Sequence, residues 1–201
     1  MKYPTLHGYF CSRRRLLTAS LGLVLTSRAQ ATTQEIEAIL AGSGSADEKL
    51  TTLMPALVRT LSTDRCFIYM RDPRRRMTAY THGHSTMTDW PARPGGSWRP
   101  EPNPASLNEP MLKKAFTDPT ALFIDDIETA GPSVVNLAIE RGVFGHRSLI
   151  HAPLYHSGTF YGILETTMRR VPRNWSAGDR AIVVNLQPAV ARLAAEFLGH
   201  V

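Results

Sequence analysis

The sequence is poor in cysteine. Only two cysteines, Cys11 and Cys66, occur among its 201 residues. Cys11 lies in a basic N-terminal segment, whereas Cys66 lies in the apolar run CFIYM, which is typical of a buried strand. With Cys66 alone in the remainder of the chain, an internal disulfide and a cysteine-based metal cage are both excluded there.

The signatures of common catalytic templates are also missing. The sequence contains no Gly-x-Ser-x-Gly elbow, no His-Glu-x-x-His pair, no glycine-rich phosphate loop and no dinucleotide fingerprint. We therefore predict that the protein is not an enzyme.

Acidic residues are absent from the first 31 positions, and this uneven charge decides how the net charge is interpreted. The whole chain carries a formal charge of +6, of which Lys2, Arg28 and residues 13–15 supply five, so the rest carries only +1. A nucleic-acid-binding domain needs a basic face on its folded part, because contacts with phosphates supply most non-specific affinity. The sequence therefore predicts no nucleic-acid partner.

Residues 1–31 have the layout of a signal peptide. A basic stretch at 12–15 precedes an apolar stretch at 16–25 and small residues at 29–31. The apolar stretch is shorter than the ~20 residues of a bilayer-spanning helix, so no stable membrane span is predicted. The run SRRRLLT at 12–18 is similar to a twin-arginine export motif, which implies export to the periplasm. If the segment is instead a basic helix or follows a misplaced start codon, the protein is cytoplasmic.

The rest of the chain alternates helix and strand signals. Apolar residues over 46–61 recur at the spacing of an amphipathic helix, which Pro55 should kink. Residues 32–45 are predicted to form a short helix and a Gly/Ser linker. Strands are predicted at 66–71, 77–84, 121–127, 147–155 and 159–168, and further helices at 110–116, 132–140 and from Ser176 onward. This order indicates an α+β fold built on an antiparallel sheet.

Five segments in this order resemble a GAF domain. They are DRCFIY at 64–69, FIDDI at 123–127, RSLIHAPL at 147–154, GIL at 162–164 and PRNWS at 172–176. The stretches 98–102 and 144–147 are further similar to stand-alone GAF proteins common in cyanobacteria. The resemblance covers residues 46–198 and implies a central sheet of about six strands. It also implies that the N- and C-terminal helices pack on one face, with a ligand pocket on the other.

The resemblance also suggests which residues line the pocket. These candidates are Tyr80, Phe123, Asp125, Ile127, His146, Arg147, His151 and Glu165. Some GAF domains attach a tetrapyrrole through a pocket cysteine, but no cysteine follows Cys66, so covalent attachment at the usual site is excluded. Methionine sulfoxide reductases of the family use several cysteines, because a sulfenic acid needs a resolving thiol. We therefore expect no covalent cofactor and an unidentified, non-covalent ligand.

Three further groups of residues have two interpretations each. His82 and His84 could bind zinc with a third ligand from His146 or His151, although ordinary hydrogen-bonded histidines are commoner, and we predict no metal. Asp125 and its neighbour Asp126 point to opposite faces of a strand, so they cannot act as an acid/base pair. Asp125 either accepts hydrogen bonds from a ligand or caps the next turn.

The long loop over 85–109 contains Trp90 and Trp98, which either close over a planar ligand or pack the loop onto the sheet.

Two functions remain open. In the first, the domain is a small-molecule sensor that signals through a homodimer or a partner protein. In the second, it is an interaction module whose pocket is filled by side chains such as Phe123, Tyr161 and the tryptophans. A remaining cavity of a few hundred Å³ would favour the first function.

Overall fold

The computed structural model describes residues 33–92 and 95–201. The predicted signal segment, residues 1–31, lies outside the described residues. Six strands form one sheet in the order β3-β2-β1-β6-β5-β4, and every neighbouring pair is antiparallel. The strands are β1 (Arg65–Asp72), β2 (Met77–Ser85), β3 (Arg99–Pro100), β4 (Leu122–Ile124), β5 (Ser148–His156) and β6 (Thr159–Met168). The predicted sheet of about six antiparallel strands is confirmed.

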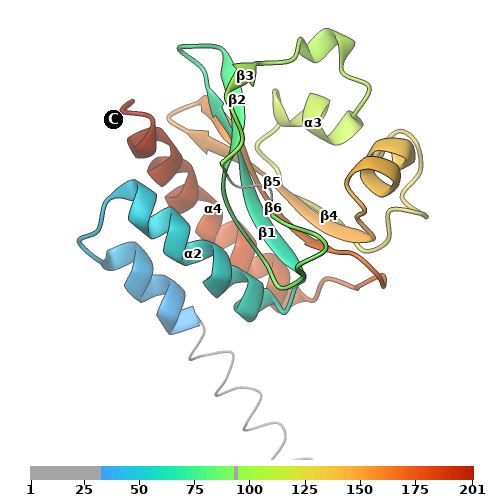
Figure 1. Cartoon of the computed structure of the whole chain (residues 1–201), viewed down its shortest axis with the longest axis horizontal. Coiled ribbons are helices and arrows are strands. Elements are labelled where there is room, and N and C mark those ends of the chain that lie inside the picture. Colours follow the sequence, from blue (N-terminus) through green and yellow to red (C-terminus); the bar gives the residue numbers. More distant parts are fainter. Residues whose placement is uncertain (1–32, 93–94) are drawn as a thin grey trace, which may run out of the picture.

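Two long helices, α2 (Ala46–Leu61) and α4 (Ala177–Phe197), cover one face of this sheet, which we call the helix face (Figure 1). Each begins with a capping box, in which a serine and a carboxylate three residues later satisfy backbone N–H groups reciprocally. A shorter helical stretch at 33–41 lies beside α2 and buries Ile36 in the same core. Within the part of the chain that the structure describes, no helix is long and apolar enough to cross a membrane.

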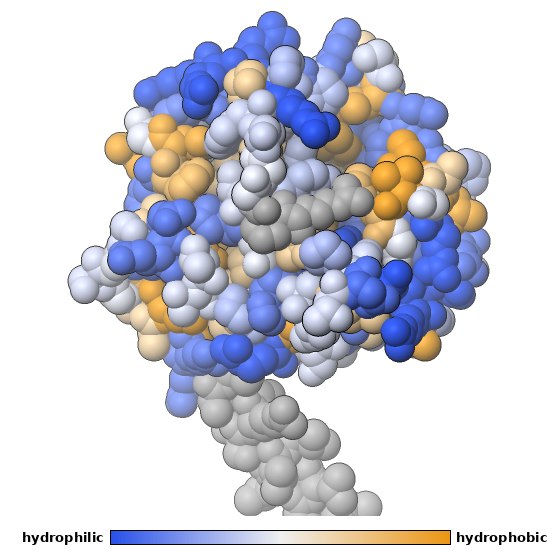
Figure 2. Space-filling model, in the orientation of Figure 1, coloured by the Kyte–Doolittle hydropathy of each residue, from blue (hydrophilic) through white to orange (hydrophobic). Residues whose placement is uncertain are grey.

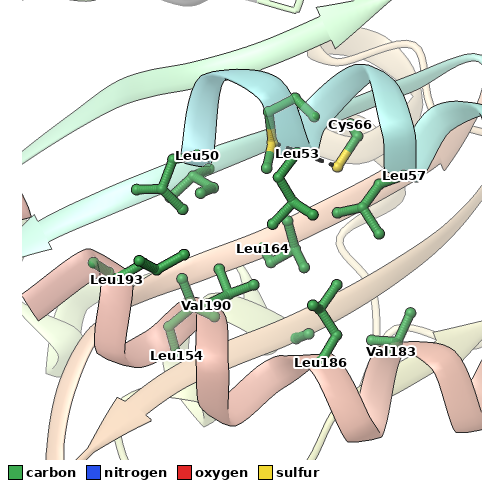
Figure 3. Close-up of a cluster of buried hydrophobic side chains, with 14 of the residues drawn as sticks. Leu50, Leu53, Leu57, Cys66, Leu154, Leu164, Val183, Leu186, Val190 and Leu193 are labelled. Atoms are coloured by element: carbon green, nitrogen blue, oxygen red, sulfur yellow. Dashed lines mark hydrogen bonds between the residues drawn. The ribbon is translucent and has the colours of Figure 1, made fainter. Parts of the chain in front are cut away.

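The main core fills the space between the sheet and the two helices. Leucines spaced three and four residues apart on α2, such as Leu50, Leu53 and Leu57, meet Val190 of α4 and Leu164 of β6 in one cluster (Figure 3). Each of these side chains is at most 3% exposed. Their removal from water supplies the main driving force that holds the helices on the sheet.

The opposite face, called here the cavity face, is covered by shorter segments. These are the loop over 86–109, helix α3 (Pro110–Ala115) and a helical turn at Ala138–Val143. The helix predicted at 132–140 forms only at its end, from residue 137, because residues 132–134 form a turn and the Asn136 side chain donates to the Asn108 carbonyl. The wide helical turn that follows is closed by a bond from the Phe144 N–H to the Ile139 carbonyl, five residues back.

Two bulges decide which side chains point to which face. Ile68 lies opposite His82 and Tyr69 opposite Tyr80, so Thr81 is an extra residue in β2. A bulge breaks the strict alternation of a strand. Tyr80 therefore faces the cavity, whereas His82 faces the helices and contacts their side chains. The second irregularity, between β5 and β6, coincides with Gly162, whose φ is +128°.

The exposed edge of β5 is protected beyond the short β4. Only Leu149 to His151 and their β4 partners pair there. Pro153, further along β5, has no N–H to offer, and its carbonyl accepts a hydrogen bond of 2.5 Å from the Gln187 side chain of α4. At the next position on that edge, the Tyr155 hydroxyl bonds to the Ala115 carbonyl at 3.0 Å.

We predict that Gly162→Ala destabilises the domain by roughly 3 kcal/mol or more, because strain and crowding add. A Cβ at position 162 would lie 2.1 Å from the Tyr69 carbonyl oxygen, at a positive φ that side chains rarely adopt. Gly158→Ala is the matched control, since Gly158 also has a positive φ but has open space around it. Urea unfolding should show a loss of only about 1 kcal/mol for the control. Equal losses for the two variants would contradict the role of the close approach.

Candidate functional site

A cavity of about 530 Å³ lies between the cavity face of the sheet and the segments that cover it. This volume is in the range of small-molecule sites. Strands β1, β2, β5 and β6 form its floor, and α3 and the helical turn at Ala138–Val143 form its walls. The lining residues are Phe67, Tyr69, Thr78, Ala79, Tyr80, Gly96, Ser97, Arg99, Glu109, Leu112, Glu140, Val143, Phe144, His151, Ile163 and Glu165.

The floor is aromatic at one end. Phe67 and Tyr69 are two residues apart on β1, so both point to the cavity face, and Tyr80 of β2 lies against both. The Tyr80 ring centroid is 5.4 Å from that of Phe67 and 5.2 Å from that of Tyr69. The Tyr69 hydroxyl donates to Thr78 at 2.9 Å, which fixes its ring. These rings offer apolar faces to a planar group.

The other end is polar and deeply buried, and Arg65 at the start of β1 anchors it. Arg65 is 1% exposed, and its guanidinium lies 3.7 Å from the centroid of the Trp90 ring. It approaches His146 to 2.6 Å at Nε2. Because arginine only donates, His146 accepts at Nε2, so its proton lies on Nδ1 and is donated to Glu140 at 2.5 Å.

The carboxylate of Glu165 lies between the imidazole rings of His146 and His151. Its two carboxylate oxygens lie 3.5 Å from His146 Nε2 and 3.0 Å from His151 Nδ1. Burial favours the neutral form of Glu165, but the hydrogen bond from His151 and the neighbouring positive groups outweigh it and hold the pKa below its usual value. Glu165 is therefore the ionised carboxylate of the cluster, and it sets the orientation of His151.

The pKa values of Glu140 and Glu109 are raised, in contrast to that of Glu165. Burial, together with the negative charges of Glu165 and Glu109, raises the pKa of Glu140 to about 9. Burial also raises the pKa of Glu109. The three carboxyl groups thus share a site in which only one is held strongly in its charged form.

Two acceptor atoms in the lining have no hydrogen-bond partner. They are Nε2 of His151 and Oε1 of Glu109, on side chains that are 4% and 7% exposed. The second oxygen of Glu109 accepts the Leu112 N–H at the start of α3, so the carboxylate is held in place. An unsatisfied buried polar atom costs about 1–3 kcal/mol, which a ligand with suitable donors would recover.

The structure brings together half of the predicted pocket residues. Tyr80, His151 and Glu165 line the cavity, and His146 lies directly behind Glu140 and Glu165. Whether these residues contact a ligand stays a prediction.

The other four predicted residues lie away from this cavity. Phe123 packs with the core on the helix face, under the Arg180 guanidinium. Asp125 accepts the Trp175 N–H at 3.0 Å, from a segment fifty residues further along the chain, whereas the turn after β4 is capped by Asp126, which accepts the Glu128 N–H. Arg147 pairs with Asp126 and Glu128, and Ile127 belongs to a small core cluster beside a second hollow. Phe123 lies opposite Ile150, a residue of the helix-face core, and the chain leaves β4 after Ile124, so Asp125 and Ile127 are not strand residues as predicted.

Several lining residues were not predicted. Glu109 and Glu140 come from a loop and a short helical turn that have no periodic pattern to mark an inward position. Glu109 has one usable signal, since it directly precedes the proline that starts α3 and acts as its N-cap. The alternation of Phe67 and Tyr69 along β1 is a second signal, visible once the face of Cys66 is assigned to the helices.

The four histidines considered for zinc lie on two faces of the sheet. The Thr81 bulge turns His82 to the helix face, where it lies 3.1 Å from Asp47, while His146 and His151 lie at the cavity. Among the described residues, the side chains placed to hold a metal ion are Glu140, His146 and Glu165, whose ligand atoms lie within 4.8 Å of one another. The Arg65 guanidinium already provides the positive charge beside them.

The Cys66 thiol and the two loop tryptophans pack within the fold and do not line the cavity. Cys66 points to the helix face, with Sγ 3.8 Å from the Met54 sulfur, so it does not reach the cavity (Figure 3). Burial raises the pKa of its thiol well above the usual value. Trp90 is 6% exposed and donates to the Phe144 carbonyl at 2.7 Å, and Trp98 packs against the main core. Both tryptophans pack the loop onto the fold.

We predict that Glu140→Gln makes the stability of the domain less sensitive to alkaline pH. The native pKa of Glu140 is above its usual 4.5, so folding retains a proton that unfolding releases, and stability is lost as pH rises from about 4.5 to about 9. This loss is at most about 1.4 kcal/mol per pH unit. Glutamine is neutral and keeps an oxygen for His146. Urea unfolding between pH 5 and 8 should therefore show a growing advantage of the variant.

The control for this experiment is Glu37→Gln, which removes a carboxylate from an exposed position of the helical stretch at 33–41. Its stability profile should run parallel to that of the wild type. A parallel profile for Glu140→Gln as well would show that Glu140 does not hold a proton in the native state.

The comparisons with known proteins agree with this geometry. The family model for the GAF domain matches residues 45–195. The phycocyanobilin-bound GAF domain from a cyanobacterial phytochrome is similar with a TM-score of 0.65 and 18% identity, over 86% of this chain and 97% of that chain. No curated protein matches the sequence.

Two other solved structures are similar. They are the GAF domain from an Acinetobacter phosphoenolpyruvate-protein phosphotransferase (TM-score 0.63, 14% identity, 86% and 98% coverage) and the free methionine-R-sulfoxide reductase from Neisseria meningitidis in complex with its substrate (TM-score 0.61, 14% identity, 86% and 92% coverage). At these identities the structures support the fold alone. Because the family model matches more than half of the sequence, the chain belongs to the GAF domain family.

Proposed function

We propose that this domain is a non-enzymatic sensor that binds a small molecule non-covalently in the cavity. The observation that carries the proposal is the open cavity of about 530 Å³ with two buried acceptors that have no protein partner. A cavity that served only packing would be filled by apolar side chains, because protein interiors are close-packed. A ligand accounts for both the open volume and the unpaired acceptors.

Non-covalent binding follows from the position of the thiol. Cys66 is the only cysteine among the described residues, and its Sγ faces the helices. The similar phytochrome domain binds phycocyanobilin in its structure, and the similar reductase is in complex with its substrate. Here the cavity lining contains no cysteine, so neither a thioether nor a cysteine redox cycle is expected.

The alternative function, an interaction module with a filled pocket, has less support. Phe123, Tyr161 and Trp98 were the side chains expected to fill the pocket, but all three pack with the core on the helix face. Trp90 contacts Arg65 and His146 beside the cavity and is absent from its lining. The volume therefore stays open.

A signal would leave the domain through the helices or through a partner. Strands β1 and β6 present cavity residues on one face and core residues that touch α2 and α4 on the other, so a ligand could bias helix packing. Apolar side chains are scattered among hydrophilic ones on the face shown in Figure 2. The exposed large apolar residues are Val134, Leu137, Val143, Val171, Val184 and Val201. A homodimer through α4 would bury Val184, its one large and exposed apolar side chain.

We predict that Leu112→Trp abolishes binding of small aromatic fragments without unfolding the domain. Leu112 is half-buried on α3 at the wall of the cavity, so a larger ring there fills the volume. Ligand-observed NMR with a set of cationic, neutral and anionic aromatic fragments measures the binding. The wild type should give hits that compete with one another.

Val184→Trp is the matched control, because it places the same side chain on the exposed surface of α4. The control should keep every hit. If the wild-type protein binds no fragment, or if Leu112→Trp keeps the hits, the sensor proposal fails and the interaction module becomes the better account.

We also propose that the full chain is exported to the periplasm through its twin-arginine-like segment. The support is the sequence motif at 12–18 followed by a short apolar stretch. We predict that the double substitution Arg13→Lys and Arg14→Lys retains the protein in the cytoplasm. Fractionation of a bacterial host with intact-mass measurement tests this, and an uncut cytoplasmic wild-type protein would contradict export.

A further inference from the structure

The lining of the cavity is acidic. It contains three carboxyl groups, on Glu109, Glu140 and Glu165, and the one guanidinium in it belongs to Arg99, which is exposed. Arg65 lies behind this lining, where its guanidinium donates to His146, and Glu165 lies beside the same histidine. Glu140 has His146 at 2.5 Å and the Arg65 charge nearby, whereas Glu109 is a buried acid with no ion-pair partner among the described residues, an expensive arrangement in a low-dielectric interior.

From this lining we infer that the ligand is an organic cation, an aromatic or planar molecule that carries a protonated amine or amidine. This inference rests on the proposed function and names the chemical class that the cavity accepts. The amine would lie at the Glu109 and His151 end, and the planar part would lie on the rings of Phe67, Tyr69 and Tyr80.

The hydrogen-bonding groups at the polar end require a donor. In His151, Nδ1 faces the Glu165 carboxylate, which can only accept, so the tautomer that fits this contact carries its proton on Nδ1 and presents Nε2 as an acceptor. Glu109 likewise presents Oε1 as an acceptor while Oε2 is used by the Leu112 N–H. A carboxylate or phosphate on a ligand has no proton to give to either atom, whereas an ammonium group has three.

The charge state points the same way. Burial raises the pKa of Glu109 although the Leu112 N–H and His151 act in the opposite direction, which means that its carboxylate is only partly compensated in the ligand-free domain. A cation supplies both the charge and the donors, and hydrogen bonds to charged groups are the stronger ones. The aromatic end adds to this preference, because a ring face attracts a positive charge as well as a stacked ring.

A bare metal ion is a less suitable occupant. The three ligands that could hold one, Glu140, His146 and Glu165, already have Arg65 against His146 Nε2 at 2.6 Å. A metal ion at that nitrogen would meet the guanidinium at short range, and the repulsion between two positive charges in a buried site is large. The two unpaired acceptors lie on other residues, His151 and Glu109.

Three indoles with the same ring and different charge test the inference. Isothermal titration calorimetry at pH 7.5 with the full chain compares tryptamine, which is cationic, with the neutral tryptophol and the anionic indole-3-propionate. Tryptamine should bind at least about tenfold more tightly than tryptophol, the lower end of what a charged hydrogen bond contributes. Indole-3-propionate should bind more weakly than both.

Glu109→Gln then identifies the partner of the amine. Glutamine keeps an oxygen for the Leu112 N–H and loses the charge, so tryptamine should lose about tenfold in affinity while tryptophol changes little. Glu37→Gln removes the same charge from an exposed position outside the cavity and should leave all three affinities unchanged. Circular dichroism and thermal melts show whether each variant is folded, and the wild-type comparison of the three indoles stands without any variant.

The outcomes separate this inference from the proposed function. If tryptophol or indole-3-propionate binds as tightly as tryptamine, and Leu112→Trp removes that binding, the cation inference is overturned while the sensor proposal stands. If none of the three indoles binds at millimolar concentration, the cation inference is overturned as well, and the fragment experiment alone decides the proposed function.

Discussion

The buried guanidinium of Arg65 is the charge on which the arrangement of the cavity depends. A positive charge in the interior is tolerated only when opposite charges and acceptors surround it. Here Trp90 stacks on the guanidinium and His146 accepts from it. Because arginine stays protonated, the tautomer of His146 is fixed, and its Nδ1–H donates a hydrogen bond to Glu140. Glu165 lies beside this group and accepts a hydrogen bond from His151, so the polar end of the cavity is fixed by buried side chains on the cavity face of the sheet.

One face of the sheet packs against the helices and the other lines the cavity, and the bulges direct side chains to the appropriate face. Without the bulge, with Thr81 as an ordinary strand residue, strict alternation would turn His82 to the same face as Tyr80 and disturb the aromatic end of the cavity. The bulge lets β2 place Tyr80 under the ligand site and His82 against Asp47 and Phe197 of the helices. Gly162 performs a similar function in β6, where the absence of a side chain lets the backbone of β1 approach closely.

The elements with a regular period could be predicted from the sequence, and the site could be predicted only in part. The helix at 46–61, the strand at 159–168 and the cap at Ser176 agree with their patterns because each buries one continuous apolar face. Tyr80, His151 and Glu165 came from the family resemblance. Glu109 and Glu140 did not, since their inward position depends on tertiary contacts made by non-periodic segments. The bulge at Thr81 leaves no trace in the alternation of a short polar strand.

The edges of the sheet have a consequence for how this domain meets other proteins. The outer strands β3 and β4 have two and three residues, and Pro153 with the Gln187 amide occupies the next stretch of β5. A long, unpaired edge is what an incoming peptide needs to add itself as a further strand. Beyond β3, the loop occupies the outer edge of β2 at Tyr80, whose carbonyl accepts the Gly96 N–H at 3.1 Å, so neither edge of the described sheet offers a long template. A partner protein therefore cannot bind by adding a strand to this sheet, and it has to contact side chains on the helices or loops.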